Sequence, residues 1–564
     1  MRISCLLFMC FFSMTARSQI PANEVAPEDA SFNTVYTGRS IPVVTGRLLN
    51  LPAREQKNIT ISYALVTPFP QSHVQKTANV KADGTFSLEL DYALPYQQIW
   101  LAVGDYFYAG VYANEDLCVE LDITKLKPVN GVQFNGDGVR YLGTDGPLNV
   151  YLNNYVLYKR SDQLRIDDEM NQLRVSRSRN IDSLLPLYGQ LWDSLQTIEN
   201  SYTASNPSPY SWILPNERLS EYYSQLCLLF LGKTMDNALW QKIKGHRSFL
   251  VSNNSTEFYK AISWYVSGLP GRLGRAGWKD VADLPDLDAG ERKLIDSLRE
   301  GEEMKPAAPY TPENMKRWTS RLAPRIQSIN FLRNIQKIDS SFPSAKADFI
   351  KLWISAGSDL REQELAEKQI LASMHSPWCI AVEKEEHARL LRKLDDVNRI
   401  LAQGSVGNEL GSFGKPLLET DFGASMYDIT GMKASDLLAK LKQSFPGKAI
   451  LIDRWATWCG PCLAEMPHSK KLQEASKGMP VVFVYLCTLY SSSKDKWLSK
   501  VAELKQPGFH FLIDEKLDAE VSDFFSFNGY PGYALIDKDG NYRPGDIQWI
   551  ATIENRDALA ALIK

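Results

Sequence analysis

The chain has 564 residues, which is too long for a single hydrophobic core and favours roughly two to four domains. Hydrophobic residues make up 44% and charged residues 23%, ordinary values that argue against a disordered, collagen-like or multi-span membrane chain. With 63 basic and 66 acidic residues the formal net charge is -3, so the sequence has no electrostatic signature of nucleic-acid binding or of a polybasic membrane anchor.

The N-terminus has the pattern of an export signal. Arg2 is followed by an apolar run over residues 3–14, and residues 16–18 (ARS) place small side chains at a cleavage site. This pattern is typical of a secretory signal peptide, so we expect residues 1–18 to be removed and the mature chain to be periplasmic or in the cell envelope. A membrane-anchoring helix is the alternative, but the run is shorter than the roughly 20 residues of a membrane span. Large residues before Cys10 argue against a lipid anchor.

Residues 19–40 show no hydrophobic period and are predicted to be a linker. Over residues 41–140 apolar residues alternate with polar or small ones, and turn residues such as Asp83-Gly84 interrupt the alternation. Alternation of this kind is typical of half-buried antiparallel strands, so we expect a small β-sandwich over 41–140. The alternating positions include Ile59, Ile61, Tyr63, Leu65, Phe86, Leu88, Leu90, Ile99, Leu101, Val103, Leu117, Val119, Leu121 and Ile123.

The hydrophobic period changes near Gly146-Pro147, after which apolar residues recur at helical spacing and strand patterns are scarce. Residues 141–403 are therefore predicted to form an all-α domain without a fixed-period repeat. Helical stretches are expected around Leu184, Leu187, Leu191 and Leu195, and near 218–232, 312–339, 344–355, 360–374 and 381–402.

A Gly- and Ser-rich stretch from Gly404 to Gly414 marks the next boundary. Beyond it, apolar strands alternate with helical patterns, which is typical of an α/β layer. Residues 404–564 are therefore predicted to be an α/β domain in a multidomain chain. The expected strands are Ala449–Trp455, Val481–Leu486 and Ala534–Asp537, and the expected helices are Leu437–Phe445, Leu463–Lys477, Lys494–Leu504 and Arg556–Ile563.

Trp458-Cys459-Gly460-Pro461-Cys462 is the strongest chemical motif in the sequence. The two-residue spacing lets both sulfur atoms meet at the start of a helix. Unpaired N–H groups and the helix dipole would stabilise a thiolate on Cys459 there and lower its pKa. Cys462, one turn further, is expected to be more buried and to resolve a mixed disulfide rather than to attack first.

Two other roles are open to this cysteine pair, a stable structural disulfide and half of a zinc site. A zinc site needs a second pair of Cys or His ligands, and His468, Cys487 and His510 have no paired spacing. We therefore expect no metal and no other cofactor. The remaining cysteines beyond the signal peptide, which have no assignable partner, are Cys118, Cys227 and Cys379.

The residues around the motif, IDRWATWCGPCLAEMP from Ile452 to Pro467, resemble thioredoxin and, more closely, the exported TlpA/ResA-like thiol–disulfide oxidoreductases. A second segment, NGYPGYALIDKDGNY from Asn528 to Tyr542, is similar to that family's cis-proline loop and the strand after it. The resemblance is confined to the C-terminal part of the chain. It implies a thioredoxin-like fold for residues 404–564 and a redox-active dithiol.

The resemblance also implies roles for single residues at the reacting centre. Cys459 corresponds to the nucleophile and Cys462 to the resolving cysteine. Asp453 corresponds to the buried acid beneath the motif, which takes a proton from the resolving thiol. A carboxylate in an apolar strand has a raised pKa, which suits this role. A purely structural buried acid is the alternative.

On the substrate side, Pro531 corresponds to the family's cis-proline, and the backbone of Tyr530 would pair with substrate peptide. An ordinary trans turn proline is the alternative for Pro531. Glu465 corresponds to an acid that shapes the substrate site, with a solvated helix face as the alternative. The other residues implied at the substrate site are Trp458, Gly460 and Pro461.

Three positions depart from the family pattern. Arg454 stands where an aromatic residue is usual, and if buried it needs an acidic partner or cover from another domain. Gly532 replaces a frequent threonine, which would leave the groove more open. Cys487 ends a central strand, where a small buried side chain is a simpler reading than a third redox thiol.

Gly460-Pro461 is the dipeptide found between the cysteines of thioredoxin, whose reduction potential of about −270 mV lies toward the reducing end. A reducing role outside the cytoplasm requires electrons from elsewhere, and the resemblance implies a membrane thiol donor of the DsbD/CcdA kind. The implied substrates are disulfides of exported proteins. Two alternatives stay open: a thiol peroxidase, for which Thr457 has the wrong spacing from Cys459, and a binding or scaffold protein whose first two domains engage a partner.

Overall fold

The structure, a computed structural model, describes residues 26, 29, 31–37, 39–51, 59–68, 73–104, 106–126, 137–175, 181–249, 251–268, 276–304, 322–354, 359–404, 410–553 and 555–563. The predicted signal peptide lies outside these residues. Among them, no helix combines the length and apolar character needed to cross a membrane. The chain divides into two compact units: Met1–Ile295, Pro324–Ser355 and Gln369–Lys384 form the first, and Asp296–Ala323, Ala356–Lys368 and Glu385–Lys564 form the second.

In the first unit, the described strands form two four-stranded sheets that share one apolar core. Alternating residues such as Leu117, Val119 and Leu121 point into this core, as the period of two predicts. One sheet has the order β4 (Thr85–Leu88), β1 (Val43–Leu49), β7 (Asp116–Asp122), β8 (Val139–Leu142). The other has the order β3 (His73–Ala78), β2 (Ile61–Val66), β5 (Gln97–Val103), β6 (Phe107–Ala113).

One pairing in these sheets differs from the all-antiparallel expectation. Strands β1 and β7 pair in parallel, from Val43 opposite Asp116 to Leu49 opposite Asp122. A parallel pair needs a long crossover connection, and the chain between these two strands supplies it by forming strands of both sheets. Local alternation predicts a strand but does not reveal its direction relative to a distant partner.

Apart from the short α1, the helices of the first unit follow its strands, and they bury aromatic as well as aliphatic side chains. In α3, Leu184, Leu191 and Leu195 are buried as expected, whereas Leu187 is exposed and Tyr188 is buried in its place. The predicted linker contains a short helix, α1, whose Phe32 packs in the helical core. The helices wholly or largely in this unit are α1 (Phe32–Tyr36), α2 (Gly146–Val175), α3 (Ile181–Ser205), α4 (Ile213–Leu229), α5 (Asn237–Gly245), α6 (Asn253–Gly268), α7 (Trp278–Ala282), α10 (Ala323–Ser341) and α11 (Ser344–Lys351). Helix α8 (Ala289–Met304) is divided between the two units after Ile295.

The division into two units does not follow the predicted boundary at residue 404. It falls within α8 (Ala289–Met304), α12 (Leu360–Ser373) and α13 (Pro377–Gln403), so the last part of α13 belongs to the second unit. There Leu390, Val397 and Ile400 form an apolar cluster with Ala502 of α16 (Lys494–Leu504).

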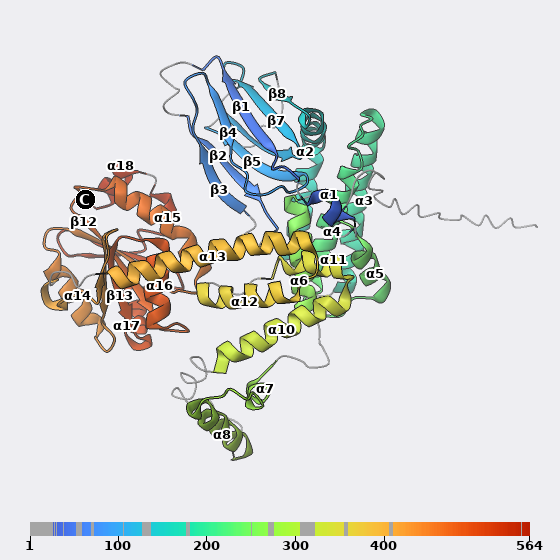
Figure 1. Cartoon of the computed structure of the whole chain (residues 1–564). Helices are drawn as coiled ribbons and strands as arrows, with labels where there is room; N and C mark the ends of the chain where they lie inside the picture. Colours follow the sequence, from blue (N-terminus) through green and yellow to red (C-terminus); the bar gives the residue numbers. More distant parts are fainter. Residues whose placement is uncertain are drawn as a thin grey trace, which may run out of the picture. The chain divides into compact units, whose positions relative to one another are not determined.

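Residues 410–553 contain a seven-stranded sheet with helices on both of its faces (Figure 1). Strands β11, β12, β13 and β10 run in parallel, while β9, β14 and β15 are antiparallel to their neighbours. The strand order is β15 (Tyr542–Pro544), β14 (Gly532–Ile536), β11 (Ala449–Trp455), β12 (Val481–Thr488), β13 (Gly508–Ile513), β10 (Ala424–Asp428), β9 (Leu418–Glu419).

The alternation of β11 sends side chains to two separate cores of this domain. Leu451 and Trp455 pack under α15 (Gly460–Ala475), α16 and α18 (Arg556–Leu562), whereas Ile450 and Ile452 pack under α14 (Ala434–Ser444) and α17 (Glu515–Phe525). Because side chains alternate along a strand, Asp453 and Arg454, which are adjacent in β11, face opposite sides of the sheet.

Two short 3-10 turns also lie in this domain, η3 (Gly411–Phe413) and η4 (Ile550–Thr552).

Candidate active site

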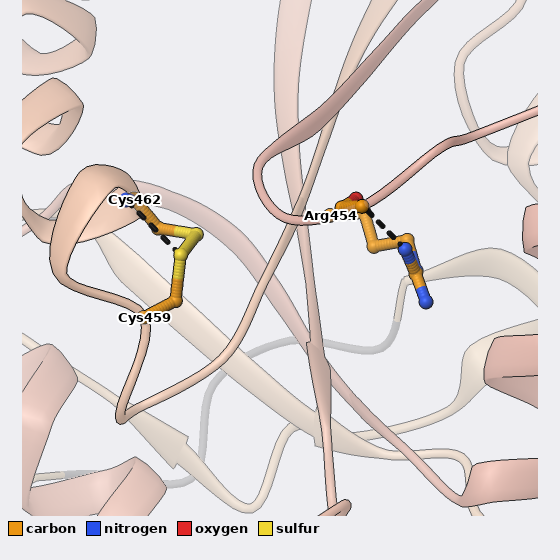
Figure 2. Close-up of a disulfide and its surroundings, with 4 residues drawn as sticks. Arg454, Cys459 and Cys462 are labelled. Carbon is orange, nitrogen blue, oxygen red and sulfur yellow. Dashed lines mark hydrogen bonds between the residues drawn. A yellow bond between two sulfur atoms is a disulfide. The ribbon is translucent and has the colours of Figure 1, made fainter. Parts of the chain in front are cut away.

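Strand β11 and helix α15 position the cysteine pair. The strand is buried along its whole length, and α15 begins at Gly460 with Cys459 as its N-cap. Cys459 and Cys462 form a disulfide with an S–S distance of 1.98 Å and a Cα–Cα distance of 5.3 Å. The backbone N–H of Cys462 donates to Sγ of Cys459 at 3.1 Å, as drawn in Figure 2. The sulfur of Cys459 thus accepts a hydrogen bond in the first turn, where donors are unpaired.

In the motif the two cysteines are buried, whereas the residues around them are exposed. Cys459 and Cys462 are 3% and 1% exposed, so the expected contrast between them is small in the oxidised pair. Trp458, Gly460 and Pro461 are exposed. These three residues therefore form an exposed rim beside the buried sulfur atoms.

Trp458 is fixed on this rim by contacts from two loops. Its indole Nε1–H donates to the carbonyl oxygen of Tyr490 at 2.7 Å. Its ring meets the Tyr490 and Tyr530 rings edge-on, at centroid distances of 6.0 and 5.5 Å. The loop after β12 and the loop before β14 thus both contact the motif through this side chain.

Asp453 is a buried acid with no hydrogen-bond partner. It is 1% exposed, and neither of its carboxyl oxygens has a partner among the described residues. Its strand neighbours are Tyr485 on β12 and Tyr533 on β14. Burial, with a smaller contribution from the charge of Glu465, raises the pKa of Asp453 to about 8. Its proton affinity is thereby suited to exchange with a thiol near neutral pH.

Glu465 lies on α15 but not on a solvated helix face. It is buried, and its Oε2 accepts a hydrogen bond from the backbone N–H of Ala551 in η4 at 3.0 Å. This contact attaches the C-terminal segment to the active-site helix. The negative charge of Glu465 acts on the site by raising the pKa of Asp453.

Arg454 is buried and has the acidic partner that its burial requires. Its guanidinium binds the carboxylate of Asp518 on α17 with two hydrogen bonds, of 2.7 and 2.9 Å. Figure 2 shows the Arg454 side chain on the opposite side of the sheet from the disulfide. Asp518 is a site residue that sequence reasoning missed, because it is 64 residues further along the chain.

The loop before β14 carries the Tyr530–Pro531 peptide bond, which is cis. Tyr530 is half-buried and packs beside the core that holds both cysteines. At the next residue the structure corrects one expectation: Gly532 does not leave the groove open. A Cβ atom there would lie 2.8 Å from Cγ of Phe527, so the Phe527 ring fills the space.

The other cysteines of the described residues form no disulfide, although Cys487 lies in the same apolar cluster as Cys459 and Cys462. Cys227, Cys379 and Cys487 are buried, and burial raises the pKa of each thiol, that of Cys379 to about 12. Cys118 is half-buried on β7. Within the described parts of the chain, no group of three or more His, Cys, Asp and Glu side chains is placed to hold a metal ion.

A mixed sheet with helices on both faces, and a disulfide at the N-terminus of the helix that follows its strand β11, define a thioredoxin-fold redox domain. Residues 423–544 match the family model named Redoxin. Together with the curated relatives, this match supports a TlpA/ResA-like thioredoxin-fold domain at the C-terminus, and it confirms the resemblance found in the sequence.

Two curated relatives give the scale of the similarity. The thioredoxin-like protein YneN of Bacillus subtilis is 32% identical over 117 residues, which is 21% of this chain and 62% of YneN. The thiol–disulfide oxidoreductase ResA of Bacillus cereus is 28% identical over 168 residues, which is 29% of this chain and 90% of ResA. Four fifths of this chain therefore lie outside the match to the first relative, and less than two thirds of that relative is covered.

Among solved structures, the thioredoxin domain of a thiol–disulfide oxidoreductase from Bacteroides vulgatus is 20% identical. The alignment covers 22% of this chain and 84% of that one, with a TM-score of 0.19. The family assignment rests on the sequence comparisons and on the site geometry.

Proposed function

We propose that this protein is an exported thiol–disulfide oxidoreductase that reduces disulfides of periplasmic or cell-envelope proteins. The observation that carries the proposal is the Cys459–Cys462 disulfide at the start of α15, in a TlpA/ResA-like domain. The relatives named thiol–disulfide oxidoreductases support the reaction class. The N-terminal signal pattern supports export.

The proposed cycle transfers two electrons from the reduced cysteine pair to the substrate. The Cys459 thiolate attacks one substrate sulfur, which forms a mixed disulfide and releases the other substrate sulfur as a thiolate. Cys462 passes its proton to the ionised carboxylate of Asp453, directly or through water, and its thiolate then attacks Sγ of Cys459. The mixed disulfide breaks, the substrate leaves as a dithiol after protonation, and the Cys459–Cys462 disulfide forms.

The substrate would be held at the exposed rim of the motif. Trp458, Gly460 and Pro461 offer apolar surface beside the sulfurs, and the backbone before Pro531 offers groups that an extended peptide could pair with. Glu465 contributes by fixing η4 against α15.

The reducing direction and the electron donor are parts of the same proposal. Gly460-Pro461 is shared with thioredoxin, which has a potential of about −270 mV. Regeneration of the dithiol then requires a membrane thiol carrier of the DsbD/CcdA kind. The sheets and helices of the first unit would present or select substrates.

The decisive experiment compares insulin reduction by wild-type protein with that of Cys459→Ser. We expect the variant to lose turnover, and Cys118→Ser, a cysteine in the other unit, to keep it. Normal turnover by Cys459→Ser would remove the basis of the proposal. A measured potential of the pair well above about −200 mV would overturn the reducing direction.

A further inference from the structure

Arg454 is the centre of a compact set of contacts with the loop that precedes β14. Its Nη1–H donates to the backbone carbonyl of Gly529 at 3.0 Å. Its Nε–H and Nη2–H donate to the two carboxylate oxygens of Asp518. One planar guanidinium therefore ties strand β11 to helix α17 and to the backbone next to Tyr530.

Aromatic rings of the same loop enclose the guanidinium. The Tyr530 ring lies 3.9 Å from the Arg454 Cζ atom, and the Phe527 ring lies 5.9 Å from it. These are cation–π distances. The Tyr530 hydroxyl also donates to Oδ2 of Asp518 at 2.5 Å. Both members of the ion pair thus contact the tyrosine that precedes the cis-proline.

The ion pair acts on the side of the sheet away from the sulfurs. Arg454 follows Asp453 in β11, so its side chain points to the face covered by α17, while Asp453 faces the core that contains Cys459 and Cys462. Asp518 neutralises the guanidinium at close range. Arg454 can therefore influence the redox centre through the loop backbone far more than through its charge.

We propose that the Arg454–Asp518 pair is a positioning element that holds the Gly529–Tyr530 backbone in the shape that receives an extended peptide chain beside a substrate disulfide. This inference rests on the proposed function. It adds that the pair favours protein disulfides over small disulfides, because only a peptide uses the loop backbone. Attack on sulfur itself does not require it.

The test uses the full mature chain and three variants, Arg454→Met, Asp518→Leu and the double variant. Removal of one partner leaves a buried charge unpaired and destabilises the fold, whereas replacement of both by apolar side chains restores much of the stability. The double variant therefore separates folding from positioning. Tyr530→Phe, which removes only the hydroxyl contact to Asp518, is a milder fourth variant.

Each variant is assayed with insulin as the protein disulfide and with 5,5′-dithiobis(2-nitrobenzoate) as the small disulfide. We expect the folded double variant to raise KM for insulin about tenfold, with kcat within about threefold of wild type. Its rate with the small disulfide and its reduction potential should match those of wild type. Tyr530→Phe should show a smaller rise in KM for insulin.

Two results would overturn the positioning role. One is an unchanged KM for insulin in the folded double variant. The other is an equal loss of activity with both disulfides, which would indicate a general structural defect. Failure of the proposed function looks different, because wild-type protein would then not reduce insulin, or Cys459→Ser would still reduce it. In that case this inference fails as well.

Discussion

Asp453 and Glu465 are two buried carboxyl groups whose charges interact. Burial, and after it the charge of Glu465, raise the pKa of Asp453 to about 8, and no hydrogen bond to the carboxyl group offsets this rise within the described residues. Glu465 is held in place by the backbone N–H of Ala551. A buried carboxyl group with a raised pKa and the acid that contributes to this rise therefore come from consecutive elements, β11 and α15.

The first prediction concerns the rate of the resolving step. Asp453→Asn removes the group that accepts the proton of Cys462, so we expect resolution of the mixed disulfide near pH 7 to slow by about tenfold or more. Rapid-mixing kinetics over pH 6–9 should show an inflection near pH 8 in wild type and none in the variant. Equal rates and equal pH profiles would assign Asp453 a structural role only.

The second prediction concerns the stability of the oxidised protein. The folded-state pKa of Asp453 is raised to about 8 from 3.8, so the folded protein holds a proton that the unfolded chain has already lost over this window. The contribution of Asp453 to the free energy of unfolding should therefore fall as pH rises from about 4 to about 8, and then level off. Urea titrations should measure the free energy of unfolding of wild type and of Asp453→Asn at each pH. The stability of the variant relative to wild type should be greater at pH 8 than at pH 5. A pH-independent difference would contradict the raised pKa.

Local signals were sufficient to predict the strand and the helix that flank the cysteine pair. The apolar run Ala449–Trp455 is β11 as expected, and the predicted helix after the cysteines is α15. Both depend on neighbouring residues alone, a buried strand and a helix start at Cys459. Asp453 was identified by its resemblance to the buried acid of the family, and its place in an apolar strand predicted the raised pKa that the structure gives.

Contacts between distant residues could not be predicted in this way. The need of Arg454 for an acid was foreseen from its apolar surroundings, but Asp518 was not identified because α17 itself was not predicted. Gly532 was expected to open the groove, since nothing in the local sequence reveals that Phe527 fills the space. The parallel pairing of β1 with β7 is a similar case, because register with a distant strand has no local pattern.

The third prediction isolates the charge of Glu465. Glu465→Gln keeps an oxygen that can accept from Ala551 but removes the negative charge, so the pKa of Asp453 should move below about 8 while burial keeps it above 3.8. Carboxyl carbon chemical shifts of labelled aspartate would measure the change. Glu474→Gln, an exposed acid on the same helix, should leave the titration unaltered. If the pKa of Asp453 is the same in Glu465→Gln as in wild type, burial alone raises it.

The fourth prediction concerns the different roles proposed for Cys459, the nucleophile, and Cys462, the resolving thiol. In the proposed cycle, Cys462→Ser keeps Cys459 as the nucleophile but removes the resolving thiol, so mixed disulfides should accumulate on Cys459. Non-reducing gels of protein recovered from the cell envelope should show adducts that disappear with dithiothreitol. The double variant Cys459→Ser/Cys462→Ser should show none. Absence of adducts on Cys462→Ser would count against resolution by Cys462.

The fifth prediction concerns the N-terminal boundary of the redox domain. Leu390, Val397 and Ile400 of α13 cover Ala502 of α16, and Lys505 forms an ion pair with Asp396 at 2.7 Å. A fragment 405–564, cut at the boundary expected from the sequence, loses all of these contacts, whereas 385–564 keeps them. The shorter fragment should therefore unfold at a temperature lower by about 5 °C or more.

The matched control for this boundary is Lys505→Ala in the longer fragment, which removes the ion pair but leaves the apolar cluster. Because both partners of that pair are partly exposed and screened by solvent, the substitution should lower the melting temperature far less than the truncation does. A large fall in the melting temperature from Lys505→Ala alone would mean that the ion pair, rather than the apolar cluster, stabilises the contact between α13 and α16. Equal melting temperatures for the two fragments would place the boundary at residue 404 after all, with α13 adding nothing to the redox domain.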